Sequence, residues 1–530
     1  MEQGRTRRAA LPRAGSREGL LEAVAIAGLT TGIGILGMVL LSSRQMLVIW
    51  PVLVSVAVFG MFTRVLWLRT GGRLFGELGF VYLSFALAYT IVPAMKVLLL
   101  DFAIPQSFDA VLFAASYPTA EELGTHFWRQ TLFNSVVAIG FLAVRTLPLP
   151  PKVTGDAPRL PSGLTIAAFS LVVVTSIGLD LYLSQSFTEY VEYYTRFEHL
   201  SWVTTKLIGL AGVLKGGGYF VILVMLFSRY RRYRAVIVVS TVLICTYEVW
   251  RSLGSRIEAF TILLAVFGLY QHRVRQISLK QGAAALVVMA MVFSTVGFLR
   301  NAAYDVERAL LEAREERGIQ GSEFDAVFAT SFHVYRERSQ GTLPPREWRM
   351  FFWEFIAVVP FVDHVTYHPQ YWYARNYFPQ AIVPPTTLGV LAESGLWGGE
   401  PDLAVRGLLN GALFAWLTRW FLRRRGRWWA LTIYVYCYAT CVLTLKYSVL
   451  YQIIPLTRMV LPALLVAGVL LYAQARLTPP KAAAATAERR RFLKRRARAG
   501  QTPGAGRAAD QAGRRTVPGA TVGVAGCESA

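Results

Sequence analysis

Cysteine, histidine and charged residues are all scarce in this chain. Of its 530 residues only 4 are cysteine and 6 are histidine, and charged residues make up 16%. Cys245, Cys437 and Cys441 fall within apolar stretches, and no CxxC pair or Cys/His spacing typical of a metal site occurs. This scarcity argues against a disulfide framework, a metal centre and a large soluble domain.

The motifs by which many soluble enzymes bind nucleotides or metals are also missing. The chain has no P-loop, no GxGxxG between a strand and a helix, no GxSxG and no HExxH. The sequence therefore gives no reason to expect a cofactor.

Long apolar runs, by contrast, are abundant. Hydrophobic residues make up 54% of the chain and the mean hydropathy is +0.42, which is typical of a polytopic membrane protein. Twelve runs approach the roughly 20 residues needed to cross a bilayer, near 20–41, 46–68, 77–100, 127–144, 163–183, 206–228, 235–251, 257–271, 281–299, 404–422, 429–446 and 453–475. We expect an all-α bundle of about twelve spans. Ten or eleven is the alternative, because only RSLGSR separates the short seventh and eighth runs.

The basic residues indicate how the chain is oriented. A net charge of +23 first suggests nucleic acid, but the basic residues cluster between apolar runs and at the two ends, as topology signals do. We therefore expect no nucleic-acid partner. With the N-terminus in the cytoplasm, alternate connections hold the positive clusters Arg69 and Arg73; Arg145, Lys152 and Arg159; Arg229, Arg231, Arg232 and Arg234; Arg273, Arg275 and Lys280; and Arg423, Arg424, Arg425 and Arg427.

This pattern divides the chain into five parts. Residues 1–19 form a basic cytoplasmic N-terminus, 20–299 a membrane domain, 300–403 one large extracytoplasmic loop, 404–475 the last three spans and 476–530 a basic cytoplasmic tail. The tail has little to bury, so we expect it to be disordered and attracted to anionic lipids. We find no convincing internal repeat, which disfavours a secondary transporter.

Several basic residues lie on the predicted outer side or within a span, where basic residues are uncommon in membrane proteins. Arg251 and Arg256 flank the RSLGSR hairpin on the predicted outer side, and Arg300 ends the ninth span on that side. These guanidinium groups could bind a phosphate or diphosphate. Alternatively, Arg251 pairs with Glu248 and Arg256 reaches the headgroups. Lys215, in LAGVLKGGGYF, lies within a span, where a charge costs roughly 2.5 to 3.5 kcal/mol and so implies a partner or a water-filled cavity. The three glycines that follow it could break the helix or allow another backbone to approach closely.

The loop carries candidates for acid–base chemistry. Asp363, His364, His368 and Glu393 could handle the proton of a substrate hydroxyl. The two histidines, four residues apart, could instead share a helix face as metal ligands or be ordinary interfacial residues, and the carboxylates could pair with Arg346, Arg349 or Arg375. The run around them is rich in aromatic residues, a composition suited to stacking on sugar rings or to an aromatic belt at the membrane interface. The residues predicted to contact glycan are Tyr367, Tyr371, Trp372 and Arg375.

Three features together resemble a known family. They are the large outer loop before the last spans, the RSLGSR hairpin that opens an apolar helix, and the re-entry segment PTTLGVLAESGLWGGEPDLAVRGLLNGALF. Over residues 76–475 the chain resembles the O-antigen polymerases, or oligosaccharide repeat-unit polymerases, which are membrane glycosyltransferases of the GT-C kind. The resemblance implies a GT-C-like bundle in a bacterial inner membrane, with both termini cytoplasmic and short helices in the loop.

The resemblance also implies a reaction. A growing glycan on undecaprenyl diphosphate would be transferred to a sugar hydroxyl of the next lipid-linked repeat unit at the outer leaflet, building a surface polysaccharide. Arg251, Arg256 and Arg300 would hold the diphosphate and Lys215 would assist, while Asp363 to His368 or Glu393 would act on the acceptor. Membrane lipids, a chain-length regulator and a flippase are the other implied partners. The alternatives are a ligase of the O-antigen ligase type, a transporter or flippase for the same lipids, and a non-enzymatic assembly partner.

Overall fold

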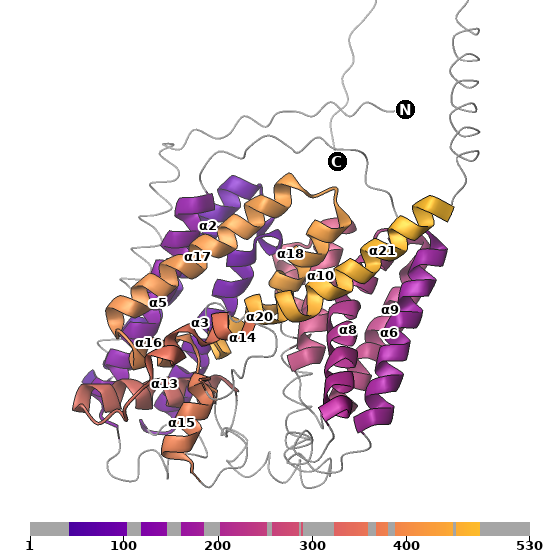
Figure 1. The fold of residues 1–530 in the computed structure, drawn as a ribbon. Coiled ribbons are helices and arrows are strands. Elements are labelled where there is room, and N and C mark those ends of the chain that lie inside the picture. Colours follow the sequence, from indigo (N-terminus) through magenta and orange to yellow (C-terminus); the bar gives the residue numbers. More distant parts are fainter. Residues whose placement is uncertain are drawn as a thin grey trace, which may run out of the picture. The chain divides into compact units, whose positions relative to one another are not determined.

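The fold is helical throughout the part of the chain that can be described (Figure 1). The computed structural model describes residues 42–102, 118–145, 161–184, 202–251, 257–285, 288–289, 323–358, 367–379, 387–448 and 452–477. No strand occurs in these ranges, so the predicted all-α class is confirmed. The chain divides into two units after Leu470, and the packing described below belongs to the first. In the second, Arg476 Nε donates to the Tyr472 hydroxyl at 3.0 Å.

Seven helical segments in the described ranges are long and apolar enough to cross a membrane. They are α2 (Ser43–Thr70), α3 (Leu78–Leu99), α5 (Ala120–Arg145), α6 (Gly163–Ser184), α8 (Trp202–Phe227), α9 (Tyr230–Arg251) and the continuous series α20 (Ile453–Pro455), η4 (Leu456–Val460) and α21 (Leu461–Leu477). Each lies at a predicted span. The chain is therefore a membrane protein by the length and composition of its helices.

Three further predicted spans are helical but do not meet the same requirements. The helix α10 (Ile257–Arg273) has 17 residues, and α17 (Glu400–Arg423) contains no 18-residue stretch that is sufficiently apolar and poor in charge. The run 429–446 is divided between α18 (Trp428–Thr440) and the short α19 (Leu443–Lys446). The predicted span 20–41 and most of 281–299 lie outside the described residues, so the count of twelve remains a prediction.

Segments predicted to lie on the cytoplasmic side meet at one end of the helices. Arg145 donates from Nε and a terminal nitrogen to the two carboxylate oxygens of Glu77, both at 2.8 Å. The Tyr434 hydroxyl donates to the Gly76 carbonyl at 2.9 Å, and Arg419 donates to the Val144 carbonyl at 2.6 Å. The connections after α2, α5 and α17 therefore share one end of the bundle.

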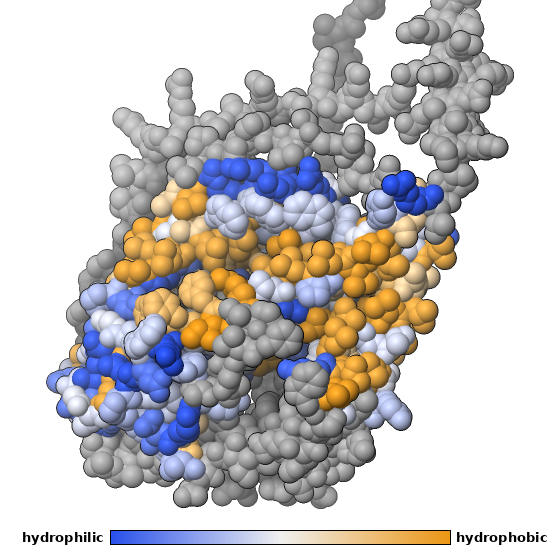
Figure 2. Space-filling model, viewed as in Figure 1, coloured by the Kyte–Doolittle hydropathy of each residue, from blue (hydrophilic) through white to orange (hydrophobic). Residues whose placement is uncertain are grey.

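The loop segment meets other helices at their opposite ends. Its longest helix, α13 (Glu323–Gln340), is held to α3 by Lys96 and Asp325, 2.5 Å apart, and to α5 by Arg336 and Glu122, 3.3 Å apart. Figure 2 shows hydrophobic side chains between two hydrophilic zones on the face in view. The alternation of sides that the charges predict fits these contacts, while the choice of cytoplasmic side stays a prediction.

The loop has a small hydrophobic core of its own. Besides α13 it contains η3 (Trp348–Phe352), α14 (Trp353–Val358), α15 (Pro369–Tyr377) and α16 (Val390–Leu396). This core is formed by Val334, Met350, Trp372, Tyr373, Leu388, Ala392 and Leu396. Short helices thus pack together as a cap, held by apolar burial as well as by ion pairs.

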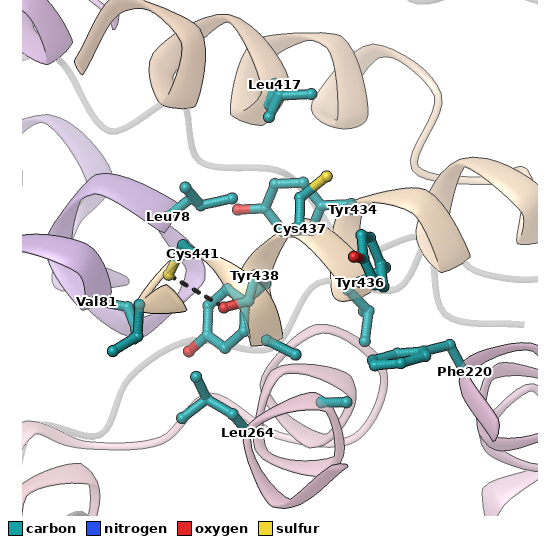
Figure 3. Packing of buried hydrophobic residues seen from close by; sticks show 14 of the residues in the cluster. Leu78, Val81, Phe220, Leu264, Leu417, Tyr434, Tyr436, Cys437, Tyr438 and Cys441 are labelled. Carbon is teal, nitrogen blue, oxygen red and sulfur yellow. Dashed lines mark hydrogen bonds between the residues drawn. The ribbon is translucent and has the colours of Figure 1, made fainter. Parts of the chain in front are cut away.

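The largest core of the first unit surrounds α18, the helix in the middle of Figure 3. Tyr434 and Tyr438 are fully buried there, and the Tyr438 hydroxyl donates to the Phe75 carbonyl at 3.0 Å. A buried tyrosine is stable when its hydroxyl has such a partner. Cys437 and Cys441 pack beside them as free thiols. The polar ends of these rings hold α18 to the turn before α3.

Glycines allow α5 and α17 to approach closely. A Cβ atom on Gly411 would lie 2.2 Å from the Val137 carbonyl oxygen, and one on Gly140 would lie 2.4 Å from that of Leu408. The segment GLLNG at 407–411 has the small-xxx-small spacing that brings membrane helices together. It also carries Asn410, whose amide donates to the buried Tyr82 hydroxyl at 2.8 Å. This contact fixes α17, which carries Arg406 toward the loop.

Candidate functional site

Four ionisable side chains converge between α6, α8 and α9. Asp180 lies near the end of α6, Lys215 in the middle of α8, and Glu248 and Arg251 in the last turns of α9. Asp180 and Glu248 are each 5% exposed and Arg251 is 7% exposed. The Lys215 side chain is 14% exposed, so all four are largely withdrawn from lipid, as the cost of a charge in the membrane requires.

Asp180 is the common acceptor of this cluster. Its Oδ2 atom accepts from Lys215 Nζ at 3.3 Å and from the Tyr247 hydroxyl at 3.1 Å. Arg251 Nε lies 3.6 Å from the same oxygen. One carboxylate thus ties together donors from two neighbouring helices.

Glu248 completes the arrangement on the other side of the lysine. Its Oε1 atom lies 3.3 Å from Lys215 Nζ and accepts from the Tyr219 hydroxyl at 2.7 Å. Two cations and two carboxylates therefore form an electrically balanced group, in which each charge offsets the desolvation of another. We call Asp180, Lys215, Glu248 and Arg251 the ion cluster.

The structure thus brings together two of the four residues that the sequence assigns to diphosphate binding. Lys215 and Arg251 belong to one cluster, while Arg256 and Arg300 lie outside the described residues. The sequence left open a pairing of Arg251 with Glu248; the carboxylate nearest to Arg251 among the described contacts is that of Asp180. Arg251 turns inward among helices and away from lipid.

The glycines after Lys215 do not break α8, which is continuous from Trp202 to Phe227. Instead they admit a neighbouring backbone: a Cβ atom on Gly217 would lie 2.1 Å from the Met459 carbonyl oxygen. Met459 belongs to η4, a π-helical turn. Turns of this kind often occur at functional sites, and this one lies against the α8 segment next to Lys215.

Glu393 lies in α16, away from the ion cluster. Its side chain is 1% exposed and its Oε2 atom is 3.0 Å from a terminal nitrogen of Arg406. Arg406 also donates from Nε to Asp402 at 2.7 Å. In Figure 1, α16 and α13 lie on one side of the bundle and α6, α8 and α9 on the other. In this conformation Glu393 neutralises an arginine and is closed to substrate.

His368 does not share a helix face with a second histidine in the described residues. It precedes α15 as the N-terminal cap, where its Nδ1 accepts from the backbone N–H of Gln370 at 3.1 Å. Its ring centroid lies 4.1 Å from that of Trp353. Asp363 and His364 lie outside the described residues. Within the described ranges no group of three or more metal-ligating side chains is found.

The residues predicted to contact glycan divide between core and surface. Trp372 is buried in the core of the loop, where its Nε1 donates to the Pro345 carbonyl at 3.1 Å. Tyr371 and Arg375 are exposed one turn apart on α15. The hydroxyl of the half-buried Tyr367 accepts from Arg349 at 3.1 Å. Of the four, Tyr371 and Arg375 present the most accessible surface for a ligand.

No protein-family model, curated protein or solved structure matches this chain. The resemblance noted over residues 76–475 therefore stays a prediction.

Sequence reasoning missed the two tyrosines that donate to the ion cluster, and Asp180 was not among its candidate site residues. Tyr219 follows Lys215 by four residues and Tyr247 precedes Arg251 by four. On a helix this spacing places each hydroxyl one turn from a cation. The signal was therefore present in the sequence, although many core tyrosines have no such role.

A second polar region lies where α3, α5 and α13 meet. A small pocket is lined there by uncharged polar residues among mostly apolar ones, including Thr90, Gln130, Asn134 and Ser331. Within the described part of the chain, Gln130 Oε1 is buried with no hydrogen-bond partner. The lining holds no cation, so this pocket does not suit a diphosphate.

The cap also contains a buried histidine. His333 Nδ1 is 3.0 Å from the Tyr373 hydroxyl, and its Nε2 is 3.8 Å from a Glu337 oxygen. Burial lowers the pKa of His333 to about 4, although Glu337 acts in the opposite direction. The imidazole is therefore neutral at pH 7 and joins α13 to α15.

Proposed function

We propose that this protein is a membrane glycosyltransferase that polymerises oligosaccharide repeat units carried on undecaprenyl diphosphate. The observation that carries the proposal is that Lys215 and Arg251 both face inward among membrane helices. Cations in such a place require a polar ligand or partner. A guanidinium and an ammonium group are suited to a diphosphate.

In the proposed reaction an acceptor hydroxyl oxygen attacks the anomeric carbon of the donor glycan. The bond from that carbon to the diphosphate oxygen breaks, and undecaprenyl diphosphate leaves with the electron pair. Lys215 and Arg251 stabilise the charge that develops on the leaving oxygen, which is where fixed cations contribute most to the rate. Arg256 and Arg300 are proposed to extend this set.

A general base then takes the proton of the acceptor hydroxyl. We propose Asp363 or His364 for this role and Tyr371 with Arg375 for glycan contact. His368 and Glu393 stay candidates in the proposal, but their described contacts suit positioning: His368 caps α15, and Glu393 holds Arg406.

The proposed reaction requires a particular orientation in the membrane. We place both termini in the cytoplasm of a bacterium, the large loop outside and the protein in the inner membrane, with about twelve spans arranged as in GT-C enzymes. The shared end of Glu77, Arg145 and Arg419 supports this orientation, because it gathers basic connections on one side.

A flippase or transporter for the same lipids is the second candidate. The specific observation in its favour is the electrical balance of the ion cluster, since paired carboxylates and cations between membrane helices also occur along proton-coupled transport routes. The lack of a convincing internal repeat counts against it.

The lipid-linked glycans that accumulate when the gene is deleted distinguish these functions. A lost polymerase leaves single repeat units on the carrier at the outer leaflet. A lost ligase leaves long carrier-linked chains, and a lost flippase leaves single units facing the cytoplasm. We expect single outer-leaflet units; either of the other patterns would overturn the proposal.

A further inference from the structure

The ion cluster presents a difficulty for any diphosphate that enters it. Lys215 Nζ is 3.3 Å from both Asp180 and Glu248, and Arg251 is 3.6 Å from Asp180. Both cations are thus already neutralised. A diphosphate that displaced nothing would place its negative charges beside two carboxylates in a medium of low dielectric constant, where like charges repel strongly.

We propose that Asp180 and Glu248 are internal counter-anions that the diphosphate replaces, and that they take up protons from water as it binds. This inference rests on the proposed function. Each carboxylate that gains a proton becomes a neutral acid, while Lys215 and Arg251 stay cationic and turn their N–H groups to the diphosphate oxygens. The protons return to water when undecaprenyl diphosphate leaves.

The two tyrosines that donate to the ion cluster fit this exchange. Tyr247 donates to Asp180 at 3.1 Å and Tyr219 donates to Glu248 at 2.7 Å. A hydroxyl can also accept a hydrogen bond, so each tyrosine can receive the proton of the neutral acid when its neighbour becomes protonated. Each carboxylate therefore keeps a hydrogen-bond partner in both states, which avoids the cost of a buried unsatisfied group.

Titratable and charged side chains from three helices, α8, α9 and α10, surround this pair of carboxylates. In the described part of the chain, the groups that act on Asp180 or Glu248 are Lys215 and Tyr219 on α8, Cys245, Tyr247 and Arg251 on α9, and Glu258 on α10. Glu258 is a third carboxylate near Glu248. Its negative charge adds to the repulsion that an entering diphosphate meets.

The test is calorimetric titration of the full-length protein in nanodiscs with inorganic diphosphate, in two buffers of different ionisation enthalpy. The two heats give the number of protons taken up on binding. We expect the wild type to take up one to two protons more than the Asp180→Asn/Glu248→Gln variant, which corrects for titration of the probe. Each additional proton should weaken wild-type binding by about tenfold per unit rise in pH.

The single variants and a matched control guard against misfolding. Glu248→Gln alone should lose part of the uptake, and Glu122→Gln, a carboxylate paired with Arg336 on the loop side, should lose none. Equal proton uptake by the wild type and the double variant would overturn the inference while leaving the function intact, provided that Arg251→Ala abolishes binding. Binding unaffected by both Arg251→Ala and Lys215→Met would overturn the inference and the proposed function together.

Discussion

Asp180 shows how one side chain can organise several helices. Its Oδ2 atom accepts from Lys215 and Tyr247 and lies near Arg251. A buried ion pair adds little net stability when it is complete, but removal of one partner leaves a charge uncompensated. Asp180 therefore matters to stability chiefly because its loss would leave these cations uncompensated.

We expect Asp180→Leu to destabilise the protein by about 3–5 kcal/mol, because it leaves two buried cations with one carboxylate. Adding Arg251→Met to this variant should restore part of the loss, which a double-mutant cycle measures from unfolding in detergent. Strictly additive effects of the two substitutions would contradict the ion pair.

His333 gives the cap a dependence on pH. Its pKa of about 4 lies below the ordinary value near 6.5, so the unfolded state binds more protons as the pH falls through this window. Stability that is complete above pH 6.5 is lost towards pH 4. We expect a loss of about 2 kcal/mol between pH 6.5 and 5, measured as lower hydrogen-exchange protection factors in α13 and α15, which are corrected for the intrinsic exchange rate at each pH. In His333→Asn the protection factors of these helices should change little over the same range; a dependence as steep as in the wild type would rule out His333 as its source.

Sequence reasoning found the individual charges of the site more readily than their partners. Lys215 is conspicuous because it interrupts an apolar run, and Arg251 because it flanks a short connection on the predicted outer side. Their pairing is not readable from the sequence, since Asp180 is 35 residues from Lys215 and 67 from Tyr247. Likewise, the aromatic composition of α15 does not reveal that Trp372 faces the core while Tyr371 faces solvent.

At the scale of elements, close backbone contacts decide which helices pair. The helices α5 and α17 meet through glycines, and α8 meets η4 through Gly217. The sequence left two outcomes open for the glycines of α8, a break or a close approach. The close approach occurs because Gly217 has no side chain, so the Met459 backbone can occupy the space beside it. The division of run 429–446 into α18 and α19 was not predicted, because an apolar run specifies length and not helical continuity.

Gly411→Ala should destabilise the pairing of α5 and α17. The added methyl group would lie 2.2 Å from the Val137 carbonyl oxygen, so the helices must separate, at a cost of about 1–3 kcal/mol. Gly178→Ala in α6 is the matched control, because no atom lies within 4 Å of its added methyl group. Thermal unfolding in detergent compares them; equal midpoints for the two variants would show that the helices are not in close contact.

At the scale of the whole molecule, the apolar runs and the alternation of charge predicted the helical class and the seven spans now described. Ion pairs at both ends of the helices are consistent with the predicted alternation of sides. Hydropathy could not predict the hydrophobic core of the cap or its contacts with α3 and α5, because both depend on residues that are distant in the sequence.

Accessibility of single cysteines tests the orientation. In a background without native cysteines, Ser339→Cys at the end of α13 should react with an impermeant maleimide in cells whose inner membrane is intact. Gly426→Cys, between α17 and α18, should react only after that membrane is permeabilised. Both positions are exposed, so the reverse pattern would mean that the chain is inserted the other way.

The central claim is that Arg251 and the ion cluster serve a diphosphate-linked glycan donor. Its most direct test is polymer formation in proteoliposomes supplied with a purified undecaprenyl-diphosphate-linked repeat unit. The account predicts long chains with the wild type and the same yield with the control Arg476→Ala, which removes an exposed arginine in the last helix. With Arg251→Ala, inserted in the membrane to the same extent, it predicts at least a hundredfold loss of rate, or about 2.7 kcal/mol in the activation barrier. Chains of normal length and yield from Arg251→Ala would contradict it.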